Sequence, residues 1–411
     1  MLKERFDVLV IGAGPAGTIA ASILKKEGFN IQMVEKQQFP RFVIGESLLP
    51  RCMDHLEAAG LLDAVKAQGF QEKIGAKFVR GDEICDFNFA NQFTKEWSWT
   101  WQVPRAQFDK TLADAIEQKG VPINYKTGVT DIKFFSDHSI TTVEHADGSK
   151  KEIEAKFIVD ASGYGRVIPR MFNLDEPSNL PARKAFFAHI KDAKRADGID
   201  GNRITIVVHR QDVWIWIIPF SNGVTSIGFV GTPEFFNQFN GVDEKSFRAM
   251  IASDPNTADR FHQAELVMQP TTIVGYSITT KKLFGDGFVL TGNATEFLDP
   301  VFSSGVTLAM ESGHTAAKLV ARHLRNDSSI DWHKDYKEHM MQGINTFRSY
   351  VSGWYDGTLH DIFFARDIKE SFKNQICSVL AGYVWDLDNP FVKKHNTALK
   401  ALAKVIEING G

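Results

Sequence analysis

Hydrophobic and polar positions along the chain follow two different periods, and each period predicts a different kind of element. Phe6 to Ile11 is a short apolar run of the kind that forms a buried parallel strand. Ala16 to Lys26 has helical spacing and ends at Gly28, a suitable C-terminal cap. Ile31 to Val34 is a second apolar run, closed by Glu35. These segments predict a strand–helix–strand unit near the start of the chain.

The pattern changes twice further along the chain. Another helix is predicted for Gln107 to Lys119, and apolar strands for Lys156 to Asp160 and Gly287 to Thr291. Between them, three β-rich runs separated by turn residues predict an antiparallel sheet; they are 204–209, 213–219 and 225–230. After about residue 330 the spacing becomes helical, with many aromatic residues, and predicts a helical C-terminal region packed over the rest.

Composition narrows the class of protein. A chain of 411 residues, 43% of them hydrophobic, can bury a large core in two or three domains. A net charge of -3 without a basic stripe argues against nucleic acid as a partner. Three scattered cysteines and widely spaced histidines predict neither a disulfide framework nor a metal site. We find no signal peptide and no apolar run long enough for an integral membrane segment, and therefore expect a cytoplasmic protein.

A glycine-rich segment lies between the first predicted strand and helix. It reads Gly12-Ala13-Gly14-Pro15-Ala16-Gly17 and matches the GxGxxG dinucleotide fingerprint. Gly12 permits the tight turn, Gly14 lets the backbone approach a pyrophosphate, and Gly17 lets the helix pack against the strand. Glu35, followed by Lys36, ends the second strand, where a carboxylate can accept hydrogen bonds from ribose. The sequence therefore predicts a bound dinucleotide.

Two later segments indicate which dinucleotide. Asp160-Ala161-Ser162-Gly163 follows one apolar strand, and Gly292-Asn293-Ala294 follows another, with Pro300 shortly after. With Arg105 at the head of a helix, this layout resembles the para-hydroxybenzoate-hydroxylase-like family of FAD-dependent monooxygenases over roughly residues 1–330. The resemblance implies FAD as the cofactor. Asn293 stands where that family usually has Asp, which removes a charge but keeps a hydrogen-bond acceptor.

Three further motifs are similar to those of flavin-dependent halogenases. The segment 41–50 reads RFVIGESLLP and contains the GES loop, and 214–219 reads WIWIIP and matches W-x-W-x-I-P. The segment 297–305 reads FLDPVFSSG and fits F-x-x-P-x-x-S-x-G. Lys73 lies in a K-x-G setting after the GES loop, where those enzymes have a lysine. We therefore identify the chain as a relative of the flavin-dependent halogenases.

The resemblance implies a reaction and a set of residues. Reduced FAD and O2 would form a flavin C4a-hydroperoxide, chloride or bromide would attack it, and Lys73 would pass the halogen to an electron-rich aromatic ring. Trp214, Trp216 and Pro219 would separate that ring from the flavin. The implied cofactor-binding residues are Gly12, Gly14, Pro15, Ala16, Gly17, Glu35, Lys36, Arg41, Gly45, Glu46, Ser47, Arg105, Asp160, Gly163, Gly292, Asn293, Pro300, Ser304, Gly305 and Val306.

One departure from the tryptophan halogenases bears on the substrate. Those enzymes pair their lysine with a glutamate, and the corresponding residue here is Phe302. The chain therefore resembles the branch that acts on phenols, pyrroles or carrier-bound substrates, and it shows no carboxylate to serve as a base beside Lys73. A separate flavin reductase is implied, because the chain has no second GxGxxG for a nicotinamide cofactor.

The expected fold is α/β. A Rossmann-type, three-layer ββα FAD-binding domain would comprise 1–80, 100–170 and 275–330, and a β-rich substrate domain 81–99 and 171–274, followed by a helical region over 331–411. Alternatives remain open at this stage. Trp214 and Trp216 could be ordinary core residues, and Lys73 a solvated lysine. The halogenase interpretation is favoured, and the alternatives are a monooxygenase, a dehydrogenase, a geranylgeranyl-reductase-like enzyme or a non-catalytic flavoprotein on the same scaffold.

Overall fold

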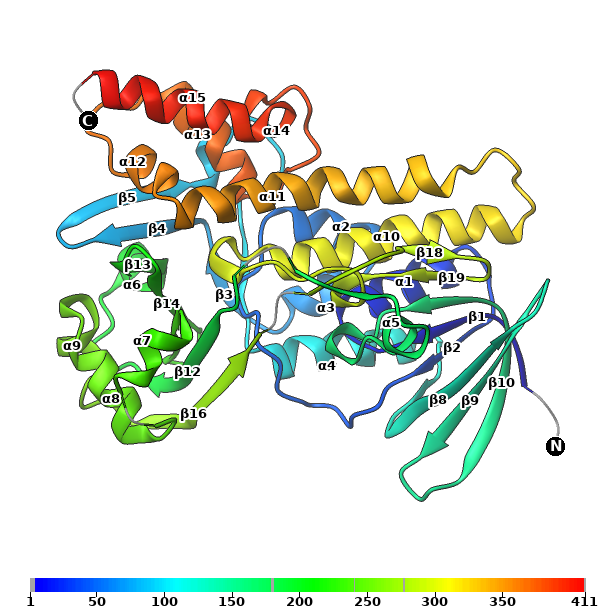
Figure 1. The fold of residues 1–411 in the computed structure, drawn as a ribbon. Helices are drawn as coiled ribbons and strands as arrows, with labels where there is room; N and C mark the ends of the chain where they lie inside the picture. The colour runs from blue at the N-terminus through cyan, green and yellow to red at the C-terminus, as the bar shows by residue number, and fades with distance from the viewer. Residues whose placement is uncertain (1–3, 179–180, 240, 276–277, 410–411) are drawn as a thin grey trace.

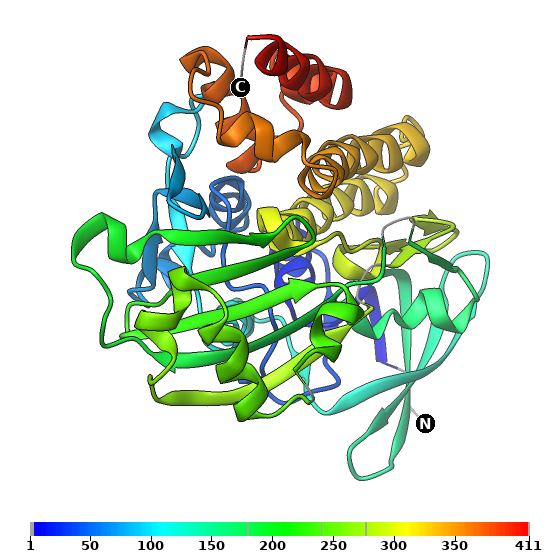
Figure 2. The same cartoon turned by 60° about the vertical axis from the view of Figure 1, so that its left-hand side comes forward.

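The structure, a computed structural model, describes residues 4–178, 181–239, 241–275 and 278–409. Two large sheets lie side by side, with helices packed over both of them (Figures 1 and 2). No helix in these ranges has the length and apolar character needed to cross a membrane. The expectation of an α/β fold with a Rossmann-type domain, an antiparallel sheet and a helical C-terminal region is confirmed.

The first sheet has eight strands and begins with the predicted strand–helix–strand unit. Its central strands run in parallel in the order β19-β10-β1-β2-β7, and β18, β9 and β8 add antiparallel pairs. Their bounds are β1 Glu4–Ile11, β2 Ile31–Val34, β7 Ile123–Asn124, β8 Thr127–Phe134, β9 Ser139–His145, β10 Lys150–Asp160, β18 Phe284–Gly285 and β19 Phe288–Leu290. The carboxyl ends of β1, β10 and β19 therefore meet at one edge, where α/β sheets bind their ligands.

The second sheet has seven strands in the order β16-β12-β15-β14-β13-β4-β5. Their bounds are β4 Gly75–Arg80, β5 Glu83–Asn88, β12 Lys184–Lys191, β13 Ile204–Arg210, β14 Val213–Pro219, β15 Val224–Gly231 and β16 Leu266–Val274. All its pairs are antiparallel except β13 with β4. Strands β4 and β5 pair with each other, so the expected boundary at residue 80, which puts β4 in the first domain, is wrong at that point. The hydrophobic pattern of a single strand does not show which sheet it joins.

Strand β14 separates two layers of core. Every residue of β14 is buried, because side chains alternate between two covered faces. Trp214, Trp216 and Ile218 belong to the large central core, whereas Val213, Ile215 and Ile217 pack in an outer core. That outer core is closed by the short helices α7 Pro233–Asn237, α8 Glu244–Ala252 and α9 Pro255–Phe261, which cover the sheet in Figure 2.

Helices cover the remaining faces. In Figure 1 the long helices α10 and α11 cross the middle of the molecule side by side, and α13 to α15 lie above them. Their bounds are α1 Pro15–Lys26, α2 Arg51–Ala59, α3 Leu62–Lys66, α4 Arg105–Gln118, α5 Val167–Met171, α6 Gly198–Asn202, α10 Ser304–Leu324, α11 His339–Tyr355, α12 Thr358–Phe363, α13 Glu370–Leu380, α14 Pro390–Lys393 and α15 His395–Ile408. The π-helix η5 is His333–Glu338, and the 3-10 turns are η1 Phe89–Asn91, η2 Gly163–Gly165, η3 Gly292–Ala294 and η4 Pro300–Phe302.

Two small sheets complete the structure. Strands β3 Gln71–Lys73 and β6 Thr100–Gln102 form one of them, and β11 Asp175–Pro177 and β17 Ile278–Thr280 form the other. The first pair sets Lys73 at the end of a strand between the two large sheets, beside the loop that precedes α2.

Candidate active site

A groove of about 1280 Å³ runs along the edge where the parallel strands end. That volume exceeds the range of roughly 300–1,000 Å³ that is usual for small-ligand pockets, and it suits an extended dinucleotide. The groove is lined by most of the residues predicted to hold the cofactor: Gly12, Gly14, Pro15, Ala16, Glu35, Lys36, Arg41, Gly45, Arg105, Gly163, Gly292, Asn293, Gly305 and Val306.

The glycine-rich turn has the geometry that its sequence predicts. Gly12 has a φ of +99°, and an added Cβ would lie 2.4 Å from the carbonyl oxygen of Ala161. At Gly17 an added Cβ would lie 2.0 Å from the carbonyl oxygen of Gly12, so this glycine allows the helix to pack and does not line the groove. Gly14 faces the groove, and only the Arg41 guanidinium comes near its Cβ position. A ligand can therefore approach the backbone of the turn closely.

Charged residues position this turn and the loop opposite. Glu35 accepts hydrogen bonds from the backbone N–H groups of Ala13 and Gln37, both at 2.9 Å. Asp109 pairs with Arg105 through both carboxylate oxygens and with Arg41 at 3.0 Å. The positive side chains that line the groove outnumber the negative ones, with Lys36, Arg41, Arg105, Lys126 and Arg170 against Glu35 and Glu144, so the groove suits a diphosphate.

Arg105 also holds the GES loop in place. Its guanidinium donates to the carbonyl oxygens of Ile44 and Gly45, and its pKa is raised by Asp109 despite the opposing effect of burial. Asp160 lies outside the groove and accepts hydrogen bonds from the N–H groups of Ser162 and Ile168. It therefore shapes the loop that carries Gly163.

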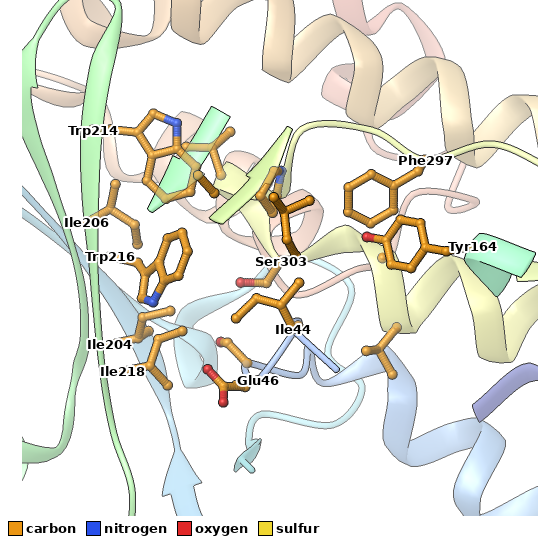
Figure 3. A pocket seen from close by; sticks show the side chains of 18 residues that line it. Ile44, Glu46, Tyr164, Ile204, Ile206, Trp214, Trp216, Ile218, Phe297 and Ser303 are labelled. Atoms are coloured by element: carbon orange, nitrogen blue, oxygen red, sulfur yellow. The ribbon is translucent and has the colours of Figure 1, made fainter. Parts of the chain in front are cut away.

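A second cavity, of about 80 Å³, adjoins the groove (Figure 3). The two share seven lining residues, which are Ile44, Gly45, Tyr164, Ile273, Phe297, Gly305 and Val306. In Figure 3 the indoles of Trp214 and Trp216 form one side, and the rings of Tyr164 and Phe297 face each other on the opposite side. The reactive end of a dinucleotide in the groove would therefore meet an apolar chamber.

The tryptophan pair is held from both sides. The ring centroids of Trp214 and Trp216 are 6.0 Å apart. The Trp214 Nε1–H donates to Tyr355 Oη at 3.0 Å, and the Trp216 Nε1–H donates to Ser226 Oγ at 3.0 Å. Both polar edges are satisfied, so the apolar faces are free to line the chamber. Pro219 lies outside it, where its carbonyl oxygen accepts a hydrogen bond from Gln102.

Helix α10 begins between groove and cavity. Ser303, its N-terminal cap residue, has a φ of +57° and makes no side-chain capping bond. Gly305 and Val306 line both spaces, whereas Ser304 is buried and Pro300 faces only the cavity. The N-terminus of this 21-residue helix is thus a favourable place for a halide or for negative charge on a flavin.

Lys73 is buried beside the cavity without lining it. Its Nζ donates to Ser47 Oγ and to the carbonyl oxygen of Leu48, both at 2.8 Å, and Ser47 lines the cavity. Burial lowers the pKa of Lys73 to about 7. The alternative interpretation of Lys73 as a solvated lysine is wrong, because the residue is only 2% exposed.

Several residues that line the chamber were not predicted from the sequence. Tyr164 and Phe297 were not predicted to line it, nor were Ile204, Ile206 and Ile218. The last three were detectable, since they alternate on the inward face of predicted strands. Phe302 packs against Phe78, Tyr350 and Trp354 in the core and leaves the chamber without a carboxylate at that point.

The glycine-rich turn, the long groove and the adjoining aromatic chamber define a flavin-dependent oxidoreductase. The chain belongs to the family described as FAD binding domain, which matches residues 5–344. A structure of a flavoprotein/dehydrogenase from Cytophaga hutchinsonii is 63% identical, with a TM-score of 0.97, over 99% of this chain and 100% of that one.

Halogenases stand among its relatives. A 1H-pyrrole-2-carbonyl-[peptidyl-carrier protein] brominase from Pseudoalteromonas luteoviolacea (strain 2ta16) is 28% identical over 94% of each chain. The structure of a triple mutant of the flavin-dependent brominase Bmp2 is 26% identical, with a TM-score of 0.83, over 98% of this chain and 99% of that one. The predicted kinship with flavin-dependent halogenases is confirmed.

Proposed function

We propose that this protein halogenates an electron-rich aromatic molecule with the help of FAD. The observation that carries the proposal is the small aromatic chamber, walled by Trp214 and Trp216, that opens onto the cofactor groove at the N-terminus of α10. A chamber of this kind excludes water from the halogenating species and holds a flat ring by its faces.

The groove fits FAD. Gly14 leaves room for a phosphate at the N-terminus of α1, Arg41 and Arg105 supply cations, and Glu35 lies where a ribose would pass. FAD, when bound and reduced, would supply the reaction with oxygen that turns a halide into an electrophile. The residues of the chain bind the halide at the start of α10, keep the chamber dry and position the ring.

Lys73 has the surroundings of a group that guides an electrophile. Its amine is held at the chamber wall through Ser47, and with a pKa of about 7 it is partly neutral near neutral pH. A neutral amine can accept the halogen of hypohalous acid, and an ammonium can donate a hydrogen bond to the oxygen of that acid. The lysine therefore acts, in this proposal, at the Ser47 edge of the chamber.

The size of the chamber limits the substrate. A cavity of about 150 Å³ accepts benzene, whereas this one measures about 80 Å³. After a modest movement of its side chains, the chamber would admit a single small ring, such as a phenol or a pyrrole. Delivery of such a ring by a carrier protein, a cytoplasmic location and a separate flavin reductase are further parts of the proposal. The brominase relative acts on a pyrrole attached to a carrier protein.

A turnover assay tests the activity. FAD-loaded protein is supplied with a flavin reductase, NADH, oxygen and bromide, together with phenol, pyrrole and carrier-bound pyrrole probes. We expect a product with the bromine isotope doublet in its mass spectrum. A gain of one oxygen that is indifferent to bromide would overturn the proposal in favour of a hydroxylase.

Replacement of Lys73 tests its role. Lys73→Met keeps the length of the buried side chain and removes its donor, so we expect bromination to fall by about 100-fold or more while FAD absorbance is retained. Lys77→Met is the matched control, because Lys77 lies on the next strand, β4, and pairs with the exposed Asp200 of α6. Equal bromination by both variants would show that Lys73 has no such role.

A further inference from the structure

Glu46 has a buried carboxylate oxygen without a partner. The side chain is fully buried, and its Oε1 lies 2.7 Å from His189 Nε2. Its Oε2 finds no hydrogen-bond partner in the described part of the chain. The residue lines the apolar chamber and not the cofactor groove, although the sequence predicts a cofactor contact. A buried acceptor without a partner is destabilising, and a donor that entered the chamber would satisfy it.

The polar groups around Glu46 already have other partners, so a donor for Oε2 would come from the chamber. His189 comes from β12 and is held edge-on by Phe42 and Phe220. Arg105, on α4, interacts electrostatically with Glu46, but its hydrogen bonds go to Asp109 and to loop carbonyl oxygens. Lys73, on β3, is occupied by Ser47 and Leu48. Figure 3 shows the carboxylate beside Trp216 and Ile218.

We propose that Glu46, positioned by His189, is the group that recognises the O–H or N–H of a phenol or pyrrole in the chamber and takes its proton during the reaction. The proton transfer rests on the proposed function, whereas the recognition of the donor depends only on Glu46 and the chamber. A carboxylate in an apolar chamber forms a charge-assisted hydrogen bond with such a donor. An aromatic ether or hydrocarbon of the same size would leave Oε2 unpaired.

The proton transfer balances with ring substitution. As the electrophilic halogen bonds to a ring carbon, the O–H or N–H proton moves to Glu46 Oε2 and its electron pair enters the ring, so the ring stays neutral. The halogen leaves the oxygen of hypohalous acid, the hydroxide that remains takes the C–H proton of the substituted carbon and departs as water, and Glu46 returns its proton to the oxygen or nitrogen. One C–H bond and one halogen–oxygen bond are exchanged for one C–halogen bond and one O–H bond.

The proposal accounts for the chamber's lack of a carboxylate at Phe302. Glu46 and Ser47 are neighbours in the GES loop, and both line the chamber. Behind the chamber wall, Glu46 pairs with His189, and Ser47 accepts a hydrogen bond from Lys73. The acid–base group and the serine that holds Lys73 thus come from one loop, which is distant in the sequence from the segment that carries Phe302.

Binding without turnover is the decisive experiment. We would measure the dissociation constants of phenol and anisole for the FAD-loaded, oxidised protein by calorimetry. The wild type should prefer phenol by about tenfold or more, the factor that corresponds to 1.4 kcal/mol. Glu46→Gln should bring this ratio close to one. His209→Gln is the matched control, since His209 makes a similar 2.8 Å pair with Asp254 on the outer side of the same sheet.

The rate of bromination tests the proton transfer. Glu46→Gln should lower this rate by about 100-fold or more. His189→Gln can still donate to Glu46 Oε1, whereas His189→Leu cannot, so the glutamine should restore the phenol preference and the leucine should not. FAD absorbance should be unchanged in all of these variants.

The outcomes separate this inference from the proposed function. A wild type that prefers phenol, and loses that preference in Glu46→Gln, supports Glu46 as the recognition group even if no bromination occurs. A phenol-to-anisole ratio that is equal in the wild type and in Glu46→Gln overturns the inference, whether or not the enzyme brominates.

Discussion

At the scale of single residues, the shape of the chamber depends on a glycine behind its wall. Gly228 in β15 lies opposite Trp216 in β14. A Cβ at this position would lie 2.3 Å from Trp216 Cζ2 and 2.6 Å from Phe187 Cβ. The indole can therefore lie flat along the sheet only because residue 228 has no side chain.

We predict that Gly228→Ala pushes the Trp216 indole into the chamber. Phenol binding should weaken by tenfold or more and the free energy of unfolding should fall by about 1–3 kcal/mol, the usual cost of overpacking, while FAD remains bound. Calorimetry and urea unfolding measure both effects. Gly353→Ala in α11 is the control, because the nearest atom to its Cβ position is a Leu359 carbon at 3.4 Å, an ordinary van der Waals contact. If both variants bind phenol equally well, Trp216 does not depend on Gly228.

At the scale of elements, a buried charged cluster joins three helices. Glu311 in α10 contacts Arg51 and His55 of α2 and His339 of α11 at 2.8–3.0 Å. His314, one turn further along α10, lies 3.3 Å from His55. Although burial alone would raise it, the pKa of Glu311 is held well below its usual range by His339, His55 and Arg51. Burial, with the neighbouring His55, lowers the pKa of His314 to about 4.

We predict that stability falls on acidification in two stages. Between pH 6.5 and about 4 the unfolded chain protonates His314 and the folded chain does not, so the free energy of unfolding decreases. Below about pH 4.5 the contribution of the ionised Glu311 is lost as well. Urea unfolding at each pH measures the curve. His314→Gln should flatten its upper stage, whereas His333→Gln, at an exposed position in η5, should leave it intact. An unchanged slope in His314→Gln would contradict the assignment.

At the scale of the whole molecule, the C-terminal helices are coupled to the chamber. Tyr355, the last residue of α11, accepts a hydrogen bond from Trp214 Nε1 and donates one to Asp299 Oδ2 at 2.8 Å. The Arg183 guanidinium lies over its ring, 3.9 Å from the centroid. One hydroxyl thus joins the second sheet, the segment before α10 and the helical region.

We predict that Tyr355→Phe loosens the wall of the chamber without loss of FAD. The Trp214 N–H loses its acceptor, which should lower the free energy of unfolding by about 1–3 kcal/mol and weaken phenol binding. Tyr383→Phe is the control, because the Tyr383 hydroxyl donates to Asp54 at 3.3 Å and does not line the chamber. Should the control weaken phenol binding as much, the effect would be one of general stability.

Sequence reasoning succeeded where neighbours in the chain form the feature. The unit β1–α1–β2 was predicted nearly residue by residue, and so were the inward-facing tryptophans of β14, because strand alternation is a local property. It was less successful where partners come from distant segments. Nothing near Lys73 in the chain indicates that it points at Ser47, and nothing near β4 indicates which sheet it joins.

The sequence by itself determined the class of cofactor and the kinship with halogenases, because glycine spacing and strand ends are read directly from the order of residues. Only the tertiary structure decided what faces the substrate. Glu46 and His189 are 143 positions apart and meet because the GES loop packs against β12. A carboxylate becomes a recognition group through the apolar chamber around it, and that chamber exists only when both sheets and α10 are assembled.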